Sequence, residues 1–180
     1  MSPCFIINVR NERVVLIVQV LKDELRHKIL LESEHLFLQR GYDRTSLQMI
    51  ADKVNISKSN LYHYFKNKEE LFYELTDSAA DGLKRMILRF RSMRFDLNMD
   101  AQEFRMLLTE EVLSLLLAEK YGLLLIMEQA NGTRYENLRP VMIELIASKI
   151  VPMLADEENS PMMAQIMARN LWDGTVHLLK

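Results

Sequence analysis

The sequence predicts an all-α fold with two parts: a small N-terminal domain of three helices that contains a helix-turn-helix, and a larger helical domain. Apolar residues recur at the three- and four-residue spacing of amphipathic helices through most of the chain. Only five glycines and four prolines occur in 180 residues, which favours long helices over sheets. We expect an N-terminal extension at 1–21, the three-helix domain at 22–66 and the second helical domain at 67–180.

The first helix is expected over residues 22–40, with Gly41 ending it as a C-cap. Residues 1–21 are harder to interpret, because residues 14–21 are richer in β-branched side chains than a helix prefers. Three alternatives stay open for them: an extension of the first helix, a strand paired with another chain, or a segment added by the choice of start site.

Two short helices joined by a tight turn are expected next, at residues 46–53 and 57–64. Thr45 stands three residues before Gln48, the spacing of a capping box, and Ser57 is a second N-cap candidate. Helices this short are marginal alone and must pack on each other. The apolar residues that allow this packing recur at helical spacing: Leu47, Ile50, Ala51, Val54, Ile56, Leu61 and Phe65.

A long fourth helix is expected after Asn67, which forms a box-like capping pair with Glu70. Its apolar stripe keeps helical period as far as Phe90, and Gly82 marks a candidate bend within it. Because this helix joins the two parts, a signal from the second domain has to pass through it.

The rest of the chain predicts further helices. They are expected at residues 101–118 and 119–130, at 136–154, and from 161 onward, with a turn at 131–133 and a polar loop at 156–161. The last two have more apolar surface than one subunit of this size easily covers. They either close the core of a monomer or pair with a second copy.

Charge is unevenly distributed. Residues 40–68 contain six basic and two acidic residues, so this segment carries +4 and the remainder carries −6. A basic island in an acidic chain is typical of a surface that contacts phosphate, although a solvated surface without a partner would give the same count.

The stretch from Arg26 to Leu75 resembles the N-terminal domain of the TetR family of bacterial transcriptional regulators. The resemblance rests on Gly41-Tyr42, Thr45 and Ile50-Ala51, then on Leu61-Tyr62-His63-Tyr64-Phe65 and on Lys66-Asn67-Lys68-Glu69-Glu70-Leu71. Many members have Gly-Thr where this chain has Ser59-Asn60. That departure leaves the fold intact but affects which base is contacted.

The second helix of such a motif enters the major groove, so its outward residues are candidates for base contacts. Lys58 can donate to guanine, Asn60 can pair with adenine in a bidentate manner, and Ser59 lets the backbone approach closely. The resemblance implies that Tyr62 and His63 also touch bases. Gln48, on the first helix of the motif, is expected to reach a flanking base.

Phosphate contacts are expected from three residues. Thr45 stands at a helix N-terminus, where backbone amides favour an anion. The resemblance implies that Tyr64 and Lys68 also bind the DNA backbone, and replacing Lys68 should lower the salt dependence of binding by about one unit. Tyr62 and Tyr64 have the alternative of serving mainly in the core, and Lys66 is expected to be a solvated neighbour.

The resemblance implies that the second domain binds a small molecule and that binding releases the DNA. Ten of the twelve methionines lie between Met86 and Met167, and methionine suits pockets that adapt in shape. An apolar or amphipathic effector is therefore expected, although methionine also fills ordinary cores. The candidate lining is Met86, Phe90, Phe104, Leu108, Leu123, Met127 and Trp172.

The expected partners are a palindromic double-stranded operator and a second copy, bound through the two C-terminal helices. No cofactor, metal site or catalytic constellation is expected, because the four histidines are scattered and no nucleophile–base pair appears. The lone Cys4 and the lack of a signal peptide or membrane span predict a cytoplasmic protein. The alternative function is a structural or cell-division role for the same DNA-binding fold, without an effector.

Overall fold

The computed structural model describes residues 9–92, 110, 112–154 and 158–180, with side chains from residue 19 onward. Every regular element in these residues is a helix, which confirms the predicted all-α class. In chain order they are α1 (Val9–Arg40), α2 (Leu47–Val54), α3 (Lys58–Leu61), α4 (Lys68–Ser92), α6 (Lys120–Glu128), α7 (Leu138–Ile150), the short 3-10 helix η1 (Val151–Met153) and α8 (Ser160–Leu179). Residues 112–118 are helical as well.

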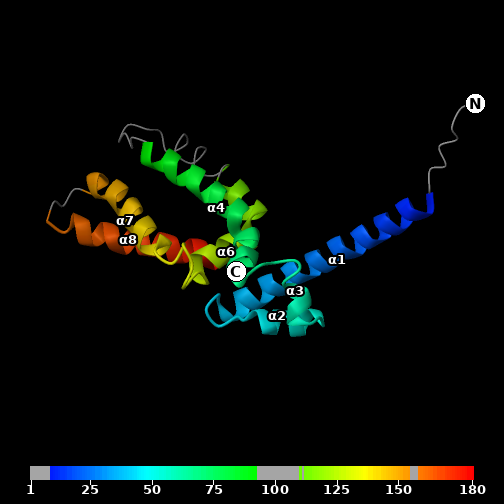
Figure 1. Cartoon of the computed structure of the whole chain (residues 1–180). Coiled ribbons are helices and arrows are strands. Elements are labelled where there is room, and N and C mark those ends of the chain that lie inside the picture. The colour runs from blue at the N-terminus through cyan, green and yellow to red at the C-terminus, as the bar shows by residue number, and fades with distance from the viewer. Residues whose placement is uncertain (1–8, 93–109, 111, 155–157) are drawn as a thin grey trace, which may run out of the picture.

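The helices form two packed groups that share α4 (Figure 1). The head consists of α2 and α3 packed under the C-terminal half of α1, together with the start of α4. The body consists of the rest of α4 with α6, α7 and α8. The N-terminal half of α1 extends away from both groups.

The first helix begins at Val9, so the expected start at residue 22 was wrong. Of the three alternatives for residues 1–21, the structure shows the helix extension for residues 9–21. No glycine or proline interrupts residues 9–40, and β-branched residues each cost a helix only a few tenths of a kcal/mol, at most about 0.7 kcal/mol. The predicted end is confirmed: Gly41 has φ 83°, and its N–H donates to the Phe37 carbonyl at 2.8 Å.

The core of the head is densely filled. Phe37 and Phe72 meet edge to face with ring centroids 5.3 Å apart, which ties α1 to the start of α4. α3 is only four residues long, so its position depends on this packing and not on its own helical stability. The fully or almost fully buried apolar residues are Ile29, Leu36, Phe37, Ile50, Val54, Leu61, Phe65, Leu71 and Phe72.

α4 and α6 cross at Gly122. A Cβ atom built on this glycine would lie 2.8 Å from the Cβ of Ala79 and 3.1 Å from the Leu75 carbonyl oxygen. Any larger residue would have to push the two helices apart, because one of these neighbours is backbone. α4 continues as one helix through Gly82, whose missing side chain makes room for Leu115.

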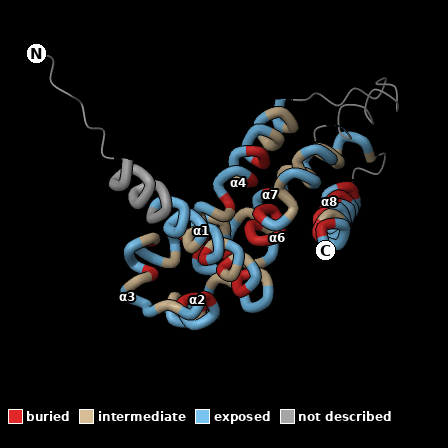
Figure 2. Tube along the Cα trace, turned by 90° about the vertical axis from the view of Figure 1, so that its right-hand side faces the viewer, coloured by how far each residue is buried: buried red, intermediate tan, exposed pale blue. Residues whose placement is uncertain are grey.

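The body has a looser arrangement than the head. Its buried core includes Leu123, Met142, Ala168 and Trp172, and many half-buried apolar residues surround it. Exposed residues recur in every turn of α8, which Figure 2 shows nearly end-on at the edge of the body. The exposed apolar residues on that helix are Met162, Met163, Ile166, Met167, Leu171 and Leu178.

Candidate nucleic-acid interface and ligand cavity

Two serine caps and a left-handed turn fix the helix-turn-helix. The Ser46 hydroxyl accepts a hydrogen bond from the Met49 N–H at 3.2 Å and begins α2. Asn55 follows α2 with φ 63°, the αL conformation that suits asparagine. The Ser57 hydroxyl accepts from the Asn60 N–H at 3.1 Å, so the predicted cap of the next helix is confirmed.

Thr45 is not a helix cap, which corrects the sequence-based prediction. Its side chain is buried, and its hydroxyl contacts the carbonyl oxygens of Gly41 at 2.8 Å and Leu36 at 3.3 Å. Its backbone N–H donates to Tyr42. Thr45 therefore holds the end of α1 against the start of α2, and the exposed groups at that helix N-terminus belong to Ser46 and Gln48.

The outward surface of α3 and the turn after it carries the predicted base-contacting residues. Lys58, Ser59, Tyr62 and His63 are exposed, and Asn60 is half-buried. α3 ends at Leu61 and not at residue 64, but the following N–H groups still bond three or four residues back, so Tyr62 and His63 continue the same surface. These five residues follow one another along α3 and the turn after it, and the Lys58 Nζ lies 6.0 Å from the centroid of the Tyr62 ring.

Two other predicted residues lie at the margin of this surface. Gln48 is exposed on α2, and its amide nitrogen donates to Asp52 Oδ1 at 2.7 Å. Tyr64 is half-buried and packs against the core of the head, in line with the alternative of a core role. The predicted cap of the next helix is present: Asn67 Oδ1 accepts from the Glu70 N–H at 2.7 Å.

Lys68 is directed into the protein. Its Nζ donates to the Tyr42 carbonyl oxygen at 2.8 Å and lies 3.9 Å from the centroid of the Tyr42 ring. Burial lowers the pKa of the Lys68 ammonium, and the nearby Asp43 carboxylate opposes this effect. The first interaction of Lys68 is therefore with the α1–α2 loop, a contact that sequence patterns could not reveal.

The same loop connects the head to the body. The Tyr42 N–H donates to the Gln129 carbonyl oxygen at 3.1 Å, directly after the end of α6. In the following turn Gly132 has φ 78°, and a Cβ there would lie 2.5 Å from Asp43 Oδ1. Tyr42 is thus held by Lys68 of α4 on one side and by the end of α6 on the other.

Arg134 makes a second connection between this turn and α4. Its guanidinium stacks 3.9 Å from the Tyr73 ring centroid and donates to Asp77 Oδ1 at 2.6 Å and to the Tyr135 hydroxyl at 2.5 Å. Burial opposes the charged form of Arg134, but the hydrogen bond to Tyr135 and the charges of Tyr135, Asp77 and Tyr73 together raise the pKa of Arg134. We did not predict Arg134, since nothing local in the sequence points to Tyr73.

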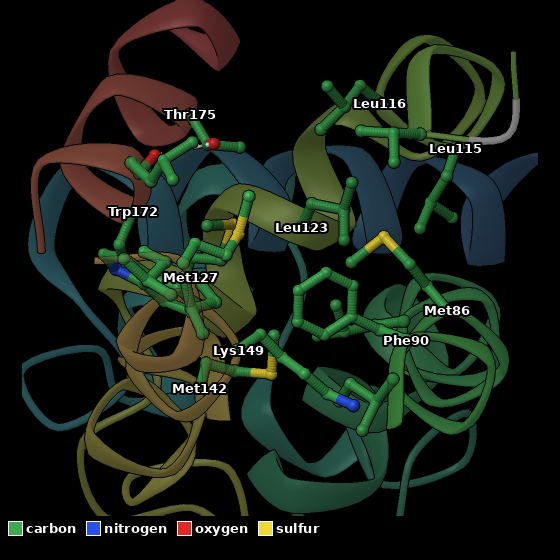
Figure 3. Close-up of a pocket in the computed structure, with 17 residues that line it drawn as sticks. Met86, Phe90, Leu115, Leu116, Leu123, Met127, Met142, Lys149, Trp172 and Thr175 are labelled. Atoms are coloured by element: carbon green, nitrogen blue, oxygen red, sulfur yellow. Dashed lines mark hydrogen bonds between the residues drawn. The ribbon is translucent and has the colours of Figure 1, made fainter. Parts of the chain in front are cut away.

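The body contains a partly open cavity of about 320 Å³ between α4, α6, α7, α8 and residues 112–116. Figure 3 shows Met86 and Phe90 of α4 facing Leu123 and Met127 of α6 across this space, with Trp172 of α8 beside them. Five of the seven predicted lining residues therefore meet in one cavity. The other two, Phe104 and Leu108, lie outside the described residues.

The described cavity wall is almost entirely apolar. Its residues are Leu83, Met86, Ile87, Phe90, Val112, Leu115, Leu116, Leu123, Met127, Met142, Ile146, Lys149, Ile150, Met153, Leu171, Trp172 and Thr175. Sequence reasoning missed the wall from α7, including Met142 and Ile146, because helical periodicity does not tell a cavity wall from a filled core. It also missed Lys149, which is the one charged residue in this described wall.

Neither a metal site nor a membrane span is found in the part of the chain that the structure describes. No group of three or more His, Cys, Asp or Glu side chains could hold a metal ion there. None of the helices in the described ranges is long and apolar enough to cross a membrane.

Three comparisons relate the chain to known proteins. Residues 29–75 match the family model described as bacterial regulatory proteins, tetR family. The chain is 34% identical over 65 residues to the negative transcriptional regulator IcaR of a Staphylococcus epidermidis biofilm operon, covering 36% of this chain and 35% of that protein. It is also 34% identical over 62 residues to the transcriptional activator FasR of Mycolicibacterium smegmatis, covering 34% of this chain and 28% of that protein.

The chain thus aligns with about a third of the length of these curated relatives. A solved structure of a gamma-butyrolactone receptor, described as an ArpA like protein, aligns over 87% of this chain and 81% of its own, with a TM-score of 0.52 and 18% identity. At that identity the likeness supports the fold alone.

Proposed function

The chain belongs to the tetR family of bacterial regulatory proteins, a family of DNA-binding regulators, and we propose that it is a transcriptional repressor that binds a palindromic operator as a homodimer. We further propose that a small apolar or amphipathic molecule enters the cavity of the body and releases the operator. Its place of action would be the cytoplasm, where bacterial DNA lies.

The observation that carries this proposal is the outward surface of α3. Lys58, Ser59 and Asn60 project from a capped helix at the edge of the head, next to exposed Tyr62 and His63. Lysine and asparagine are suited to guanine and adenine edges in the major groove. The +4 charge of residues 40–68 favours approach to phosphate.

Phosphate binding is reassigned within the head on the basis of the side-chain positions. The N-terminus of α2 presents Ser46 and Gln48 to solvent, and backbone amides at such a position favour an anion. Thr45 and Lys68 support this surface from behind, through Gly41 and Tyr42. Tyr64 retains a phosphate-binding role in the proposal, since it is only half-buried.

The exposed apolar face of α8 supports the homodimer. Met163, Met167 and Leu171 are spaced four residues apart and are 43%, 44% and 56% exposed. Apolar side chains gathered on one exposed helix face are typical of a surface that is covered by a partner. Since α7 and α8 are the most extensively packed helix pair of the body, both would contribute to the interface.

The effector role is supported by the position of the cavity between α4 and α6. Leu123 and Met127 of α6 line the cavity, and the same helix ends at the hydrogen bond from Tyr42 to Gln129. A molecule that moves α6 or α4 would therefore move the loop that precedes α2. Such a molecule shifts the equilibrium only by the difference between its affinities for the two head positions.

Selection of bound sequences from random double-stranded DNA tests the DNA-binding part. We expect a palindrome whose two halves are related by the two-fold axis of the dimer. Recovery of random sequence, with no enrichment at all, would contradict a sequence-specific regulator. Reporter expression with and without the gene then decides between repression and activation. Both are possible because IcaR is named a negative regulator and FasR an activator.

A further inference from the structure

Two parts of the described chain hold the head against the body. One is α4, which runs through both groups in Figure 1, and the other is the end of α6 with the segment that follows it, residues 129–137. Leu125 and Ala130 of this second part pack into the core of the head. Relative motion of two packed groups in one chain is the default unless their contacts oppose it. The contacts of residues 129–137 therefore decide how firmly the orientation of the head is fixed.

Arg134 attaches this segment to α4 through both its side chain and its backbone. The guanidinium carbon lies 3.9 Å from the ring centroid of Tyr73 and 4.8 Å from that of Tyr135, and a guanidinium nitrogen donates to Asp77 Oδ1 at 2.6 Å. The Arg134 N–H donates to the Tyr73 hydroxyl at 3.3 Å, and this hydroxyl donates to Glu69 Oε1 at 2.8 Å. Since Glu69, Tyr73 and Asp77 all belong to α4, Arg134 holds one short stretch of that helix.

The position of Arg134 links the head to the proposed dimer interface. The α4 residues that it contacts directly lie between Phe72, in the core of the head, and Ala79, at the crossing with α6. On the other side, α7 begins at Leu138, four residues after Arg134, and α7 contributes with α8 to the proposed interface. Arg134 thus joins the head-side segment of α4 to the start of a helix near the two-fold axis of the proposed dimer.

A general stabilising role explains only part of this contact. The side chains of Arg134 and Asp77 are 53% and 60% exposed, and an ion pair this exposed contributes little to stability. Two other charged residues, Asp81 and Lys84, line the same surface hollow and have opposite signs. Stacking of a planar guanidinium on tyrosine rings, by contrast, depends on the direction of approach. The contact is therefore better suited to fixing an orientation than to stabilising the fold.

We propose that Arg134 is a positioning residue for operator recognition: it fixes the orientation of the head relative to the two-fold axis, and thereby the half-site spacing that the dimer accepts. Two linked heads bind one palindrome together only if their separation matches the distance between the half-sites. One added base pair moves a half-site by about 3.4 Å and turns it by about 34°. This inference rests on the proposed function as a dimeric DNA-binding regulator.

The test uses the selected palindrome and two versions of it whose half-sites are moved one base pair apart or together. By fluorescence anisotropy, the full-length wild-type protein should lose about tenfold or more in affinity on either altered operator, because only one head then binds in register. Arg134→Met should reduce this loss by about threefold to tenfold, since the head can turn once a cation–π contact is removed. Its affinity for a duplex with a single half-site should equal that of the wild type.

Arg139→Met is the matched control. Arg139 donates to Asp173 at 2.9 Å, and the two side chains are 54% and 59% exposed, much like Arg134 and Asp77. This pair joins α7 to α8 and lines a hollow beside the end of α6, away from the exposed apolar residues of α8. Arg139→Met should therefore keep the wild-type loss on both altered operators. An equal relaxation in both variants would show a general loosening of the body and would overturn the proposal.

The remaining outcomes separate this inference from the proposed function. If the protein selects a palindrome and Arg134→Met shows the same loss as the wild type, the regulator stands and the positioning role is wrong. If no palindrome is selected, both are contradicted. Should Arg134→Met fail to fold, Asp77→Asn removes a partner on the α4 side and should relax the spacing in the same direction. An unchanged loss in that variant counts against the proposal as well.

Discussion

The head and the body of this molecule differ in how completely they bury their apolar side chains. The head fills its core with Phe37, Phe65 and Phe72, and most of its outward residues are polar. The body leaves a cavity of about 320 Å³ and an apolar face on α8 exposed. The difference shows that the described part of the head is closely filled, with Leu125 and Ala130 contributing to its core, whereas the described part of the body leaves apolar side chains uncovered.

The largest expected difference concerns core truncation. Phe65 is 1% exposed, so Phe65→Ala should lower the free energy of unfolding by about 3–5 kcal/mol. Phe90→Ala should cost clearly less, because Phe90 already borders empty space. Chemical denaturation of both variants measures this. Equal losses would remove the contrast between a filled head and a hollow body.

A charge on the exposed face of α8 tests whether a second copy covers it. Ile166→Glu should weaken self-association by about 2 kcal/mol or more, as loss of a central interface residue does. Leu31→Glu, on an exposed position of α1 in the head, is the matched control and should stay dimeric. Sedimentation velocity distinguishes the two. A wild-type protein that sediments as a monomer at all concentrations would contradict the dimer.

If the head contacts bases, replacing a base-contacting residue should lower the affinity for the operator more than the affinity for random DNA. Asn60→Ala should cost on the order of 1–3 kcal/mol on the selected operator and relax the preference at one base pair. Lys66→Ala, at an exposed neighbouring position, should leave that preference unchanged. Fluorescence anisotropy on operator and random duplexes gives the comparison. An equal loss on both duplexes would show that Asn60 does not contact a base.

Replacing Lys68 tests whether this side chain binds a DNA phosphate or the backbone of its own chain. From the sequence, replacing Lys68 is expected to lower the salt dependence of DNA binding. The hydrogen bond from Lys68 to the Tyr42 carbonyl predicts instead that the replacement lowers the stability of the fold. Lys68→Ala should lower the free energy of unfolding by about 1–2 kcal/mol. A salt slope reduced by about one unit at unchanged stability would restore the phosphate assignment.

Gly174 predicts the smallest effect. A Cβ added there meets nothing within 4 Å, and the residue lies inside α8. Gly174→Ala should therefore stabilise the subunit by about 0.5–1 kcal/mol, measured by thermal unfolding in the Ile166→Glu background. In the otherwise unchanged dimer, a smaller gain than this would indicate that the helices of two copies approach closely at this glycine.

Local signals predicted the head well. The expected helix at 46–53 is observed as α2 (Leu47–Val54), and the caps at Ser57 and Asn67 are present. These features depend on residues three or four positions apart, so one sequence is enough to find them. The alternative of a core position for Tyr64 was likewise visible from the apolar pattern around it.

Features that depend on distant parts of the chain were missed. Thr45 has the sequence spacing of a helix cap, but its hydroxyl donates hydrogen bonds to carbonyl oxygens at the end of α1 and at Gly41. Lys68 contacts Tyr42, 26 residues before it, and Arg134 contacts Asp77, 57 residues before it. In the cavity, residue type identified five members of the wall, but the residues that α7 contributes to it are found only when α7 is placed beside α4.

The crossing at Gly122 divides α4 into two segments of similar length, one in the head and one in the body. The pivot lies at Ala79, whose Cβ atom packs against Gly122 of α6. Met86 in the cavity wall and Phe72 in the head core each stand seven residues from it, roughly 10 Å along the helix. Because the two distances are equal, a rigid α4 that pivots at Ala79 moves at the head by the same amount as at the cavity, in the opposite direction. Under the proposed effector mechanism, the width of the ligand would then set how far the DNA-binding head moves.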